Sequence, residues 1–154
     1  MAVIGCAALA VGIFLLDLLI KNYMEKHLEE GETRPLCKGR LLIRKYHNRG
    51  AFLDLGQKNQ GVVALVSLLL THFMTVVFLS TFSFRGNAAL KAGLALLLGG
   101  AYSNTYDRLT RRYVVDYVSF PVKSQRFRRI VFNISDFCIL IGARLMTLSG
   151  LWEK

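Results

Sequence analysis

The sequence predicts an all-α membrane protein with four transmembrane helices, a small β-sheet and a short interfacial helix. Two observations support this prediction. Hydrophobic residues make up 53% of the 154-residue chain, and they gather in four long apolar runs. A helix needs roughly 20 residues to span a bilayer, and each run approaches that length. Because the runs take up most of the chain, we expect residues 1–154 to form a single membrane domain.

The four predicted spans are Ala2–Ile20, Val62–Phe84, Ala88–Tyr106 and Ile130–Gly150. The first span lacks a basic leader and a convincing small-residue cleavage site, so we expect a retained helix and not a signal peptide. A short turn joins the second span to the third, which predicts a helical hairpin. The third span contains Gly93, Gly99 and Gly100, and such small residues allow membrane helices to approach closely.

Two polar segments separate these spans. In the first segment, Leu41–Tyr46 has the composition of a strand, and Gly50–Leu53 is its predicted partner across the turn residues Asn48–Gly50. In the second segment, Val114–Val118 is predicted to be extended. The residues Gln125–Arg129 are predicted to form the interfacial helix, with one basic side. We therefore expect a small sheet on the membrane surface.

The formal net charge of +10 comes from basic residues that lie mainly between the spans. Anionic lipid headgroups are the expected partner of such loops. Nucleic acid is not expected, because no basic motif interleaved with aromatic residues is present. The cysteines Cys6, Cys37 and Cys138 have no metal-ligand spacing, and the three histidines are dispersed. We therefore expect no disulfide framework, no metal site and no cofactor.

Aspartates are the most informative residues of the chain. Four of its five aspartates lie within or beside the apolar runs: Asp17, Asp107, Asp116 and Asp136. A carboxylate near hydrocarbon is costly, so a functional role is its default interpretation. Two carboxylates brought together are the minimum equipment for aspartyl-type hydrolysis.

Helical spacing relates these aspartates to nearby polar residues. Asp17 lies four residues before Lys21, so the two can pair, either as an anchor of the helix end or as a support of an active site. On the third span, one face holds Asn104, Asp107 and Arg108, and we expect Asp107 to pair with Arg108. Polar residues at three helix ends therefore predict one convergent site.

Five local motifs occur in an order and spacing that point to one family. The stretch Gly99–Arg108 (GGAYSNTYDR) resembles GGAxxNxxDR, Val114–Tyr117 resembles VVDF, and Phe132–Asp136 (FNISD) resembles FNxAD. Asn48–Phe52 is similar to NxGAAF, and Asp17–Lys21 looks like D-x-x-x-K at the end of a first helix. In this order, they resemble the motifs of bacterial lipoprotein signal peptidase (signal peptidase II).

The resemblance implies an intramembrane aspartyl endopeptidase. Its substrates would be prolipoproteins that carry diacylglycerol on the lipobox cysteine, and the cut would fall before that cysteine. The catalytic residues would be Asp116 and Asp136. The residues that bind substrate or support the site would be Asp17, Lys21, Asn48, Asn104, Asp107, Arg108 and Asn133. The protein is expected to act as a monomer in the bacterial inner membrane, without metal or cofactor.

Departures from the motifs leave a second reading open. Tyr102 and Ser103 replace Leu-Gly, Arg112 replaces a glycine, and Ser135 replaces the alanine of FNxAD. Asp54 occupies a position where the family has a small residue. A catalytically silent paralogue, or one with altered specificity that binds lipidated peptides, would also fit. A proton-conducting or transporting bundle is a third class, but the sequence has no repeated halves.

Membrane orientation can be predicted in two ways. The resemblance implies that both termini lie in the cytoplasm and that the sheet and active site are extracytoplasmic. Counting basic residues predicts the reverse, because nine Lys/Arg in residues 21–58 and seven in residues 108–129 compare with only Arg85 and Lys91 near the helical hairpin turn. We adopt the first orientation, since the substrate is cut at the outer face.

Overall fold

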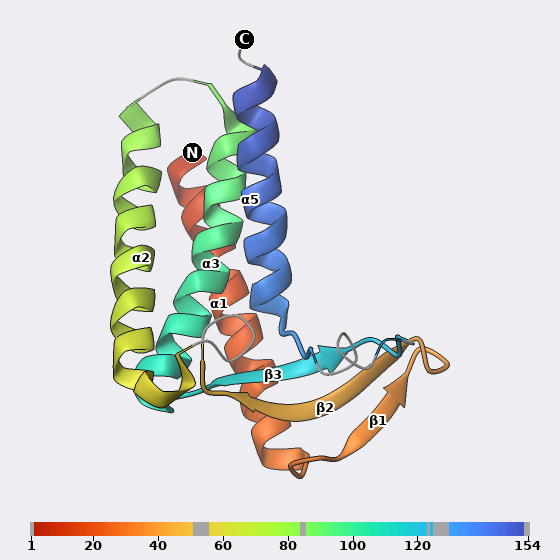
Figure 1. The fold of residues 1–154 in the computed structure, drawn as a ribbon. Coiled ribbons are helices and arrows are strands. Elements are labelled where there is room, and N and C mark those ends of the chain that lie inside the picture. Colours follow the sequence, from red (N-terminus) through yellow and green to blue (C-terminus); the bar gives the residue numbers. More distant parts are fainter. Residues whose placement is uncertain (1, 51–55, 84–85, 123, 125–129, 153–154) are drawn as a thin grey trace.

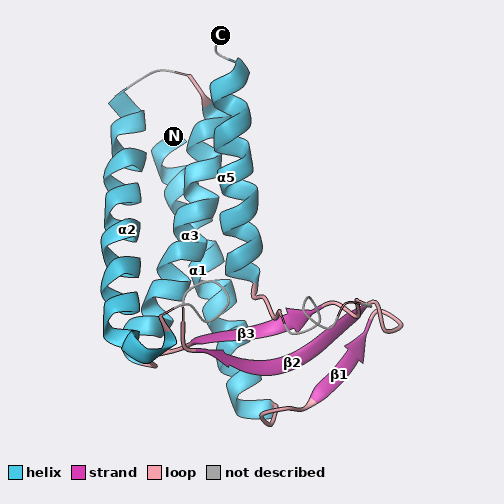
Figure 2. Ribbon diagram, viewed as in Figure 1, coloured by secondary structure: helices cyan, strands magenta, loops and turns pink. Residues whose placement is uncertain are grey.

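Four long helices run side by side, and a three-stranded sheet lies across one end of them (Figures 1 and 2). The computed structural model describes residues 2–50, 56–83, 86–122, 124 and 130–152. The elements in chain order are α1 (Ala2–His27), β1 (Thr33–Leu36), β2 (Leu41–Asn48), the 3-10 turn η2 (Gln57–Asn59), α2 (Gln60–Ser80), η3 (Thr81–Ser83), α3 (Ala88–Thr110), β3 (Val114–Ser119) and α5 (Ile134–Trp152).

The helices follow the predicted apolar runs. Helix α1 continues to His27, one to two turns beyond the apolar stretch, and its last turn carries Lys26 and His27. Cations in that position are favourable, because the C-terminal end of a helix carries partial negative charge. Helix α3 begins after Asn87, whose side chain accepts a hydrogen bond from the Leu90 amide at 2.9 Å. The predicted interfacial helix at residues 125–129 lies outside the described residues.

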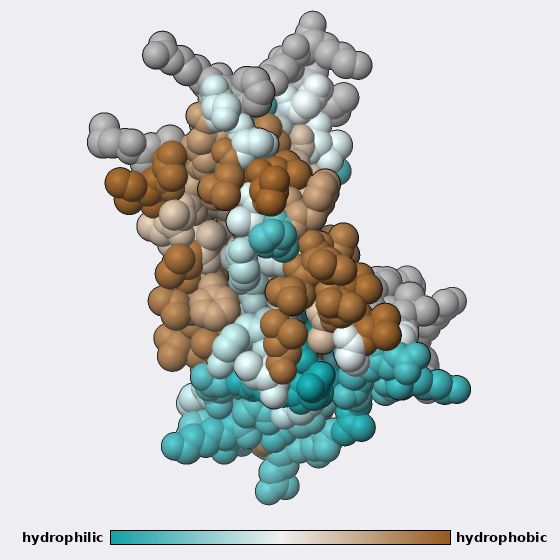
Figure 3. Space-filling view, turned by 90° about the vertical axis from the view of Figure 1, so that its left-hand side faces the viewer, coloured by the Kyte–Doolittle hydropathy of each residue, from teal (hydrophilic) through white to brown (hydrophobic). Residues whose placement is uncertain are grey.

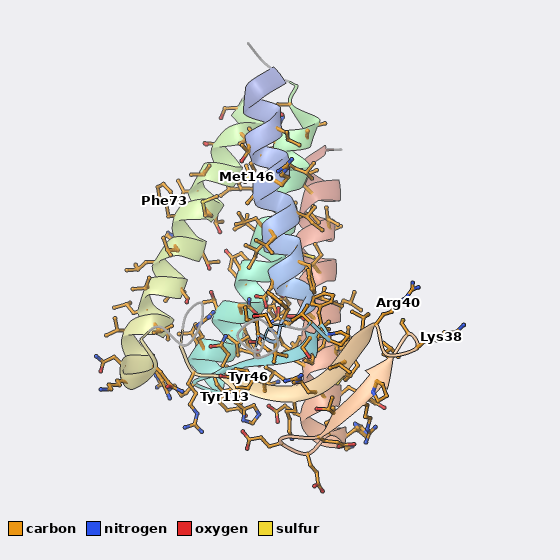
Figure 4. All side chains as sticks on the ribbon, turned by 45° about the vertical axis from the view of Figure 1, so that its right-hand side comes forward. Lys38, Arg40, Tyr46, Phe73, Tyr113 and Met146 are labelled. Atoms are coloured by element: carbon orange, nitrogen blue, oxygen red, sulfur yellow. The ribbon has the colours of Figure 1, made fainter. Side chains whose placement is uncertain are left out.

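The outer surfaces of α1 and α2 are apolar. Ile4 and Leu19 on α1 are 75% and 66% exposed, and Phe73 on α2 is 61% exposed and points away from the other helices (Figure 4). Figure 3 shows hydrophobic residues over the helical part of one face and hydrophilic residues over the sheet end. Within the described residues, Val3–His27 and Gln57–Ser83 are long and apolar enough to cross a membrane. Exposed apolar surface of this extent indicates contact with lipid and not with water.

Helix α3 packs against α1, α2 and α5. Its apolar core is formed by Leu94, Ala95 and Leu98, with Phe78 from α2. Glycines allow the closest approaches, as predicted. A Cβ atom at Gly93 would lie 2.8 Å from the Gly142 carbonyl oxygen of α5, and one at Gly100 would lie 2.5 Å from the Ser135 carbonyl oxygen. The absence of a side chain at Gly100 therefore allows the start of α5 to lie directly against the polar end of α3.

The sheet is antiparallel, with strand order β1-β2-β3. The predicted strand at Leu41–Tyr46 and the predicted extended stretch at Val114–Val118 are confirmed as parts of β2 and β3. They pair with each other, so that Leu42 opposes Ser119 and Tyr46 opposes Asp116. The pairing of β2 with β3 was not predicted, and the predicted partner of this strand, Gly50–Leu53, lies largely outside the described residues.

The turn between β1 and β2 carries exposed basic residues. Lys38 and Arg40 extend from this turn away from the helices (Figure 4). At the opposite edge of the sheet, Phe132 forms a bridge to Val118, with backbone hydrogen bonds of 2.7 Å in both directions. This bridge brings the chain just before α5 onto β3 and sets up the polar site described next.

Candidate active site

All nine polar residues predicted to form the site belong to one connected network. They come from α1, β2, α3, β3 and the start of α5, and they meet where the sheet crosses the ends of the helices (Figure 1). The nine residues are Asp17, Lys21, Asn48, Asn104, Asp107, Arg108, Asp116, Asn133 and Asp136. Two groups can be distinguished within the network by the way their charges are paired.

The first group, the inner charge cluster, consists of Asp17, Lys21, Asp107 and Arg111. Lys21 Nζ lies 2.8 Å from Asp17 Oδ2 and 3.1 Å from Asp107 Oδ2, and all three side chains are fully buried. Arg111 Nε lies 3.2 Å from Asp107 Oδ1 at the edge of the cluster. Two anions therefore alternate with two cations. Such pairing offsets the cost of removing the charges from water.

The prediction that Asp17 pairs with Lys21 is confirmed, but Asp107 does not form the expected pair with Arg108. The ion pairs of Asp107 within the described residues go to Lys21 and Arg111. The reason is helical geometry, since adjacent residues point in different directions whereas residues four apart share a face. Arg108 instead donates to the Asn104 and Gly50 carbonyl oxygens, each at 3.4 Å.

The second group, the carboxylate pair, consists of Asp116 on β3 and Asp136 in the first turn of α5. Side-chain amides connect the two carboxylates. Asn133 Nδ2 donates to Asp116 Oδ1 at 2.7 Å, and Asn104 Nδ2 donates to Asp136 Oδ1 at 3.0 Å. Asn133 Nδ2 also donates to Asn104 Oδ1 at 3.2 Å, and Asn48 Nδ2 donates to Asp116 Oδ2 at 3.1 Å. Uncharged donors thus surround both carboxylates.

The start of α5 is closed by a reciprocal pair of hydrogen bonds. The Asp136 amide donates to Asn133 Oδ1 at 2.9 Å, and the Asn133 amide donates to Asp136 Oδ2 at 3.0 Å. This is the geometry of a capping box, in which each side chain satisfies the other residue's free amide. It ties Asp136 to the same asparagine that holds Asp116.

The electrostatic environment of Asp116 favours its neutral form. Asp116 is 2% exposed, and burial together with the nearby charge of Asp136 raises its pKa to about 8. The charge of Arg108 interacts with Asp116, Asp136 and Asp107. A proton retained between the two carboxylates would leave one negative charge to balance Arg108. Asp136 is only half-buried, and the helix N-terminus at α5 stabilises a negative charge there.

Three hydroxyl groups and one arginine belong to the network although they were not predicted as site residues. Ser103, Tyr117 and Ser135 each donate a hydrogen bond to Asp17. Burial and the charge of Asp17 raise the pKa of the Tyr117 phenol, which keeps it protonated as a donor. Arg111 could have been found from its spacing, because it follows Asp107 by four residues. No local signal relates the hydroxyls to Asp17, which is far away in the sequence.

No group of three or more His, Cys, Asp or Glu side chains within the described part of the chain could hold a metal ion. Asp54, whose role the motifs leave open, lies outside the described residues.

The apolar exterior of the helices and the buried polar network at their end indicate a membrane protein. The chain belongs to the signal peptidase II family, whose model, "Signal peptidase (SPase) II", matches residues 9–152. It is therefore a membrane peptidase.

Relatives support this assignment over nearly the full chain. Lipoprotein signal peptidase of Mesorhizobium japonicum is 30% identical over 150 residues, covering 96% of this chain and 87% of the relative. That of Shouchella clausii is 31% identical over 144 residues, covering 91% and 88%. That of Halothermothrix orenii is 28% identical over 142 residues, covering 92% and 91%.

The fold is shared with solved proteins. One is a bacterial membrane enzyme determined by the in meso method at 2.3 Å resolution, with a TM-score of 0.82 and 20% sequence identity, covering 97% of this chain and 88% of that one. A second, determined by the same method at 1.9 Å resolution, has a TM-score of 0.79 and 22% identity, covering 97% and 94%.

Proposed function

We propose that this peptidase is an aspartyl endopeptidase whose catalytic residues are Asp116 and Asp136. Its substrates would be prolipoproteins with a diacylglyceryl group on the lipobox cysteine, and it would remove the signal peptide by cleaving before that cysteine. One observation carries the proposal: Asn133 donates to Asp116 and exchanges two hydrogen bonds with Asp136, so carboxylates from two elements share one support.

The environments of the two carboxylates suggest different roles. Asp116, with its pKa raised to about 8, would carry the shared proton at neutral pH. Asp136, half-buried at the N-terminus of α5, would be the ionised partner. The amides of Asn48, Asn104 and Asn133 hold the carboxylates in place but bring no charge that would force both to ionise.

The reaction then needs one water molecule. The Asp136 carboxylate accepts a proton from the water, and the water oxygen forms a bond to the scissile carbonyl carbon. Asp116 donates its proton to the carbonyl oxygen, which gives a neutral tetrahedral intermediate. As the C–N bond breaks, the proton held by Asp136 passes to the leaving nitrogen, and Asp116 regains a proton from the intermediate. The pair ends as it began.

The membrane arrangement is also part of the proposal. Helices α1, α2, α3 and α5 would all span the bilayer, as one domain covering residues 1–154 and acting as a monomer among membrane lipids. Helices α3 and α5 have 23 and 19 residues, which is close to the length that a span requires. The sheet end, with the active site, would face the extracytoplasmic side of the inner membrane.

The test is Asp116→Asn and Asp136→Asn, made separately, in a cleavage assay on a diacylglyceryl-modified precursor. Each change should lower the rate by about 10²- to 10⁴-fold, the usual contribution of an acid–base group. Glu29→Gln is the matched control, since it removes a carboxylate that is exposed after α1.

Two outcomes would contradict the proposal. Processing that continues in both variants would rule out the pair as the catalytic residues. A wild-type protein that binds but never cleaves any such precursor would be a silent member of the family.

A further inference from the structure

One buried carboxylate is hydrogen-bonded to a neighbour of each proposed catalytic aspartate. Tyr117, the residue after Asp116, donates from its hydroxyl to Asp17 Oδ1 at 2.8 Å. Ser135, the residue before Asp136, donates from its hydroxyl to Asp17 Oδ2 at 2.5 Å. Asp17 is therefore hydrogen-bonded to the chain neighbour of each member of the carboxylate pair, and these hydrogen bonds do not involve the two carboxylates themselves.

The Tyr117 hydroxyl makes a second connection. It accepts a hydrogen bond from the Ile134 amide at 3.1 Å. This amide lies at the start of α5, where amides have no partner within the helix. Tyr117 thus joins β3 to α5 as well as to α1. The strand that carries Asp116 and the helix that carries Asp136 are both fastened at this point.

Asp17 itself is held from two further directions. Lys21 Nζ lies 2.8 Å from Asp17 Oδ2, and the Ser103 hydroxyl donates to the same oxygen at 2.7 Å. Asp17, Lys21, Ser103 and Ser135 have no exposed surface, and Tyr117 is 2% exposed. With four donors around it and no access to water, the Asp17 carboxylate has little freedom to move.

We propose that Asp17 is a positioning residue that sets the separation of Asp116 and Asp136, acting through the hydroxyls of Tyr117 and Ser135. The inference rests on the proposed function, because it assigns these residues a task in the same reaction. Asp17 does not exchange a proton with substrate. Instead, it fixes the start of α5 against β3, so that the two carboxylates remain close enough to share one proton.

Geometry of this kind affects rate strongly, since a displacement of about 1 Å in a catalytic group can cost about 10²-fold. Three hydroxyls donate hydrogen bonds to Asp17. Two of them belong to Ser103 and Ser135, which lie at positions where this chain departs from the family motifs.

The test uses Tyr117→Phe and Ser135→Ala in the full-length protein, with kcat, KM and the pH dependence of kcat measured on the diacylglyceryl-modified precursor. Each change removes one hydroxyl and leaves the charges of the site intact. The matched controls are Tyr102→Phe and Ser149→Ala, whose hydroxyls bond Thr75 and the Met146 carbonyl away from the carboxylate pair.

Each test variant should lower kcat about tenfold or more with little change in KM, as expected for the loss of one charge-assisted hydrogen bond. The two apparent pKa values of the pH profile should also move closer together, because carboxylates that separate influence each other less. The ionisable groups near Asp17 include Lys21, Asp107, Asp116, Tyr117, Asp136 and Cys138. Ser135→Ala and the two controls change none of these six groups, whereas Tyr117→Phe removes the Tyr117 phenol.

The pH profile decides the outcome. If kcat falls only in step with thermal stability and the two apparent pKa values stay where they are in the wild type, the hydroxyls are merely structural and the inference is wrong. It is equally wrong if both variants keep wild-type kcat. These results are distinct from failure of the proposed function, which would appear as continued cleavage by Asp116→Asn and Asp136→Asn.

Discussion

The inner charge cluster and the carboxylate pair each contain two buried or half-buried aspartates, yet they solve the problem of buried charge in different ways. In the cluster, Lys21 contacts both Asp17 and Asp107, and Arg111 completes the pairing. In the pair, the direct donors to Asp116 and Asp136 are amides within the described residues. The comparison shows that cations pair with the aspartates of the cluster, whereas uncharged amides donate to the carboxylate pair, as the proposed sharing of one proton requires.

The energetic difference follows from this pairing. A buried ion pair is costly to break, because the remaining charge has no water to solvate it. Two neighbouring carboxylates that share one proton carry a single negative charge, and the proton can move between them at small energetic cost. Four substitutions test whether the two groups differ in this way.

The largest effect is expected from Lys21→Met. It would leave Asp17 and Asp107 buried without their shared cation and should lower the free energy of unfolding by about 3–5 kcal/mol. Thermal or denaturant unfolding in detergent measures the change, with the exposed Lys26→Met as the matched control. Equal stability of the two variants would show that the cluster does not hold the bundle together.

A pH-dependent effect of a few kcal/mol is expected from Asp116. Its folded-state pKa of about 8 lies above the ordinary value of 3.8, so the unfolded chain loses this proton at lower pH than the folded protein. Raising the pH from about 4 to about 8 therefore destabilises the folded state, on the order of a few kcal/mol through this group.

Asp116→Asn removes that titration. The difference in unfolding midpoint between variant and wild type should shift in favour of the variant as the pH rises from about 5 to about 8. Glu29→Gln, at an exposed carboxylate, should leave the wild-type dependence unchanged. If the stability difference between Asp116→Asn and wild type is the same at every pH, Asp116 does not carry a retained proton.

Asn133→Ala is expected to affect rate more than stability. It removes the amide that donates to Asp116 and accepts from the Asp136 backbone, so cleavage should slow by about 10- to 100-fold. Asn59→Ala is a suitable control, because Asn59 precedes α2 without a side-chain capping bond. An unchanged kcat would mean that the shared amide is not needed to hold the carboxylate pair.

The smallest effect is expected from Arg111→Met. Arg111 pairs with Asp107 at the edge of the cluster, where the Arg111 side chain is 18% exposed, and Asp107 keeps Lys21 as its buried partner, so the loss should be no more than about 1 kcal/mol. Unfolding of Arg111→Met should therefore lie close to that of the exposed control Arg112→Met. A loss of unfolding free energy as large as that of Lys21→Met would show that Arg111, and not only Lys21, is needed to stabilise the buried aspartates.

Local features of the sequence predicted much of the architecture. The four apolar runs became α1, α2, α3 and α5, and the glycines of α3 lie at close helix contacts. The pair Asp17–Lys21 also followed from spacing alone, because residues four apart share a helix face whatever the rest of the fold does. The predicted pair Asp107–Arg108 was wrong for the same geometric reason.

Local sequence patterns were enough to predict the helical segments, the apolar surfaces and the polar side chains that are available to a site. The pairing of these side chains depends on the packing of the whole fold. Asp17 accepts hydrogen bonds from the hydroxyls of Ser103, Tyr117 and Ser135, which lie 86, 100 and 118 residues away in the sequence. Such contacts exist only after β3 has paired with β2 and the start of α5 has packed on α3. Periodicity and spacing describe a single element, whereas the neighbours of a buried carboxylate depend on how all the elements pack.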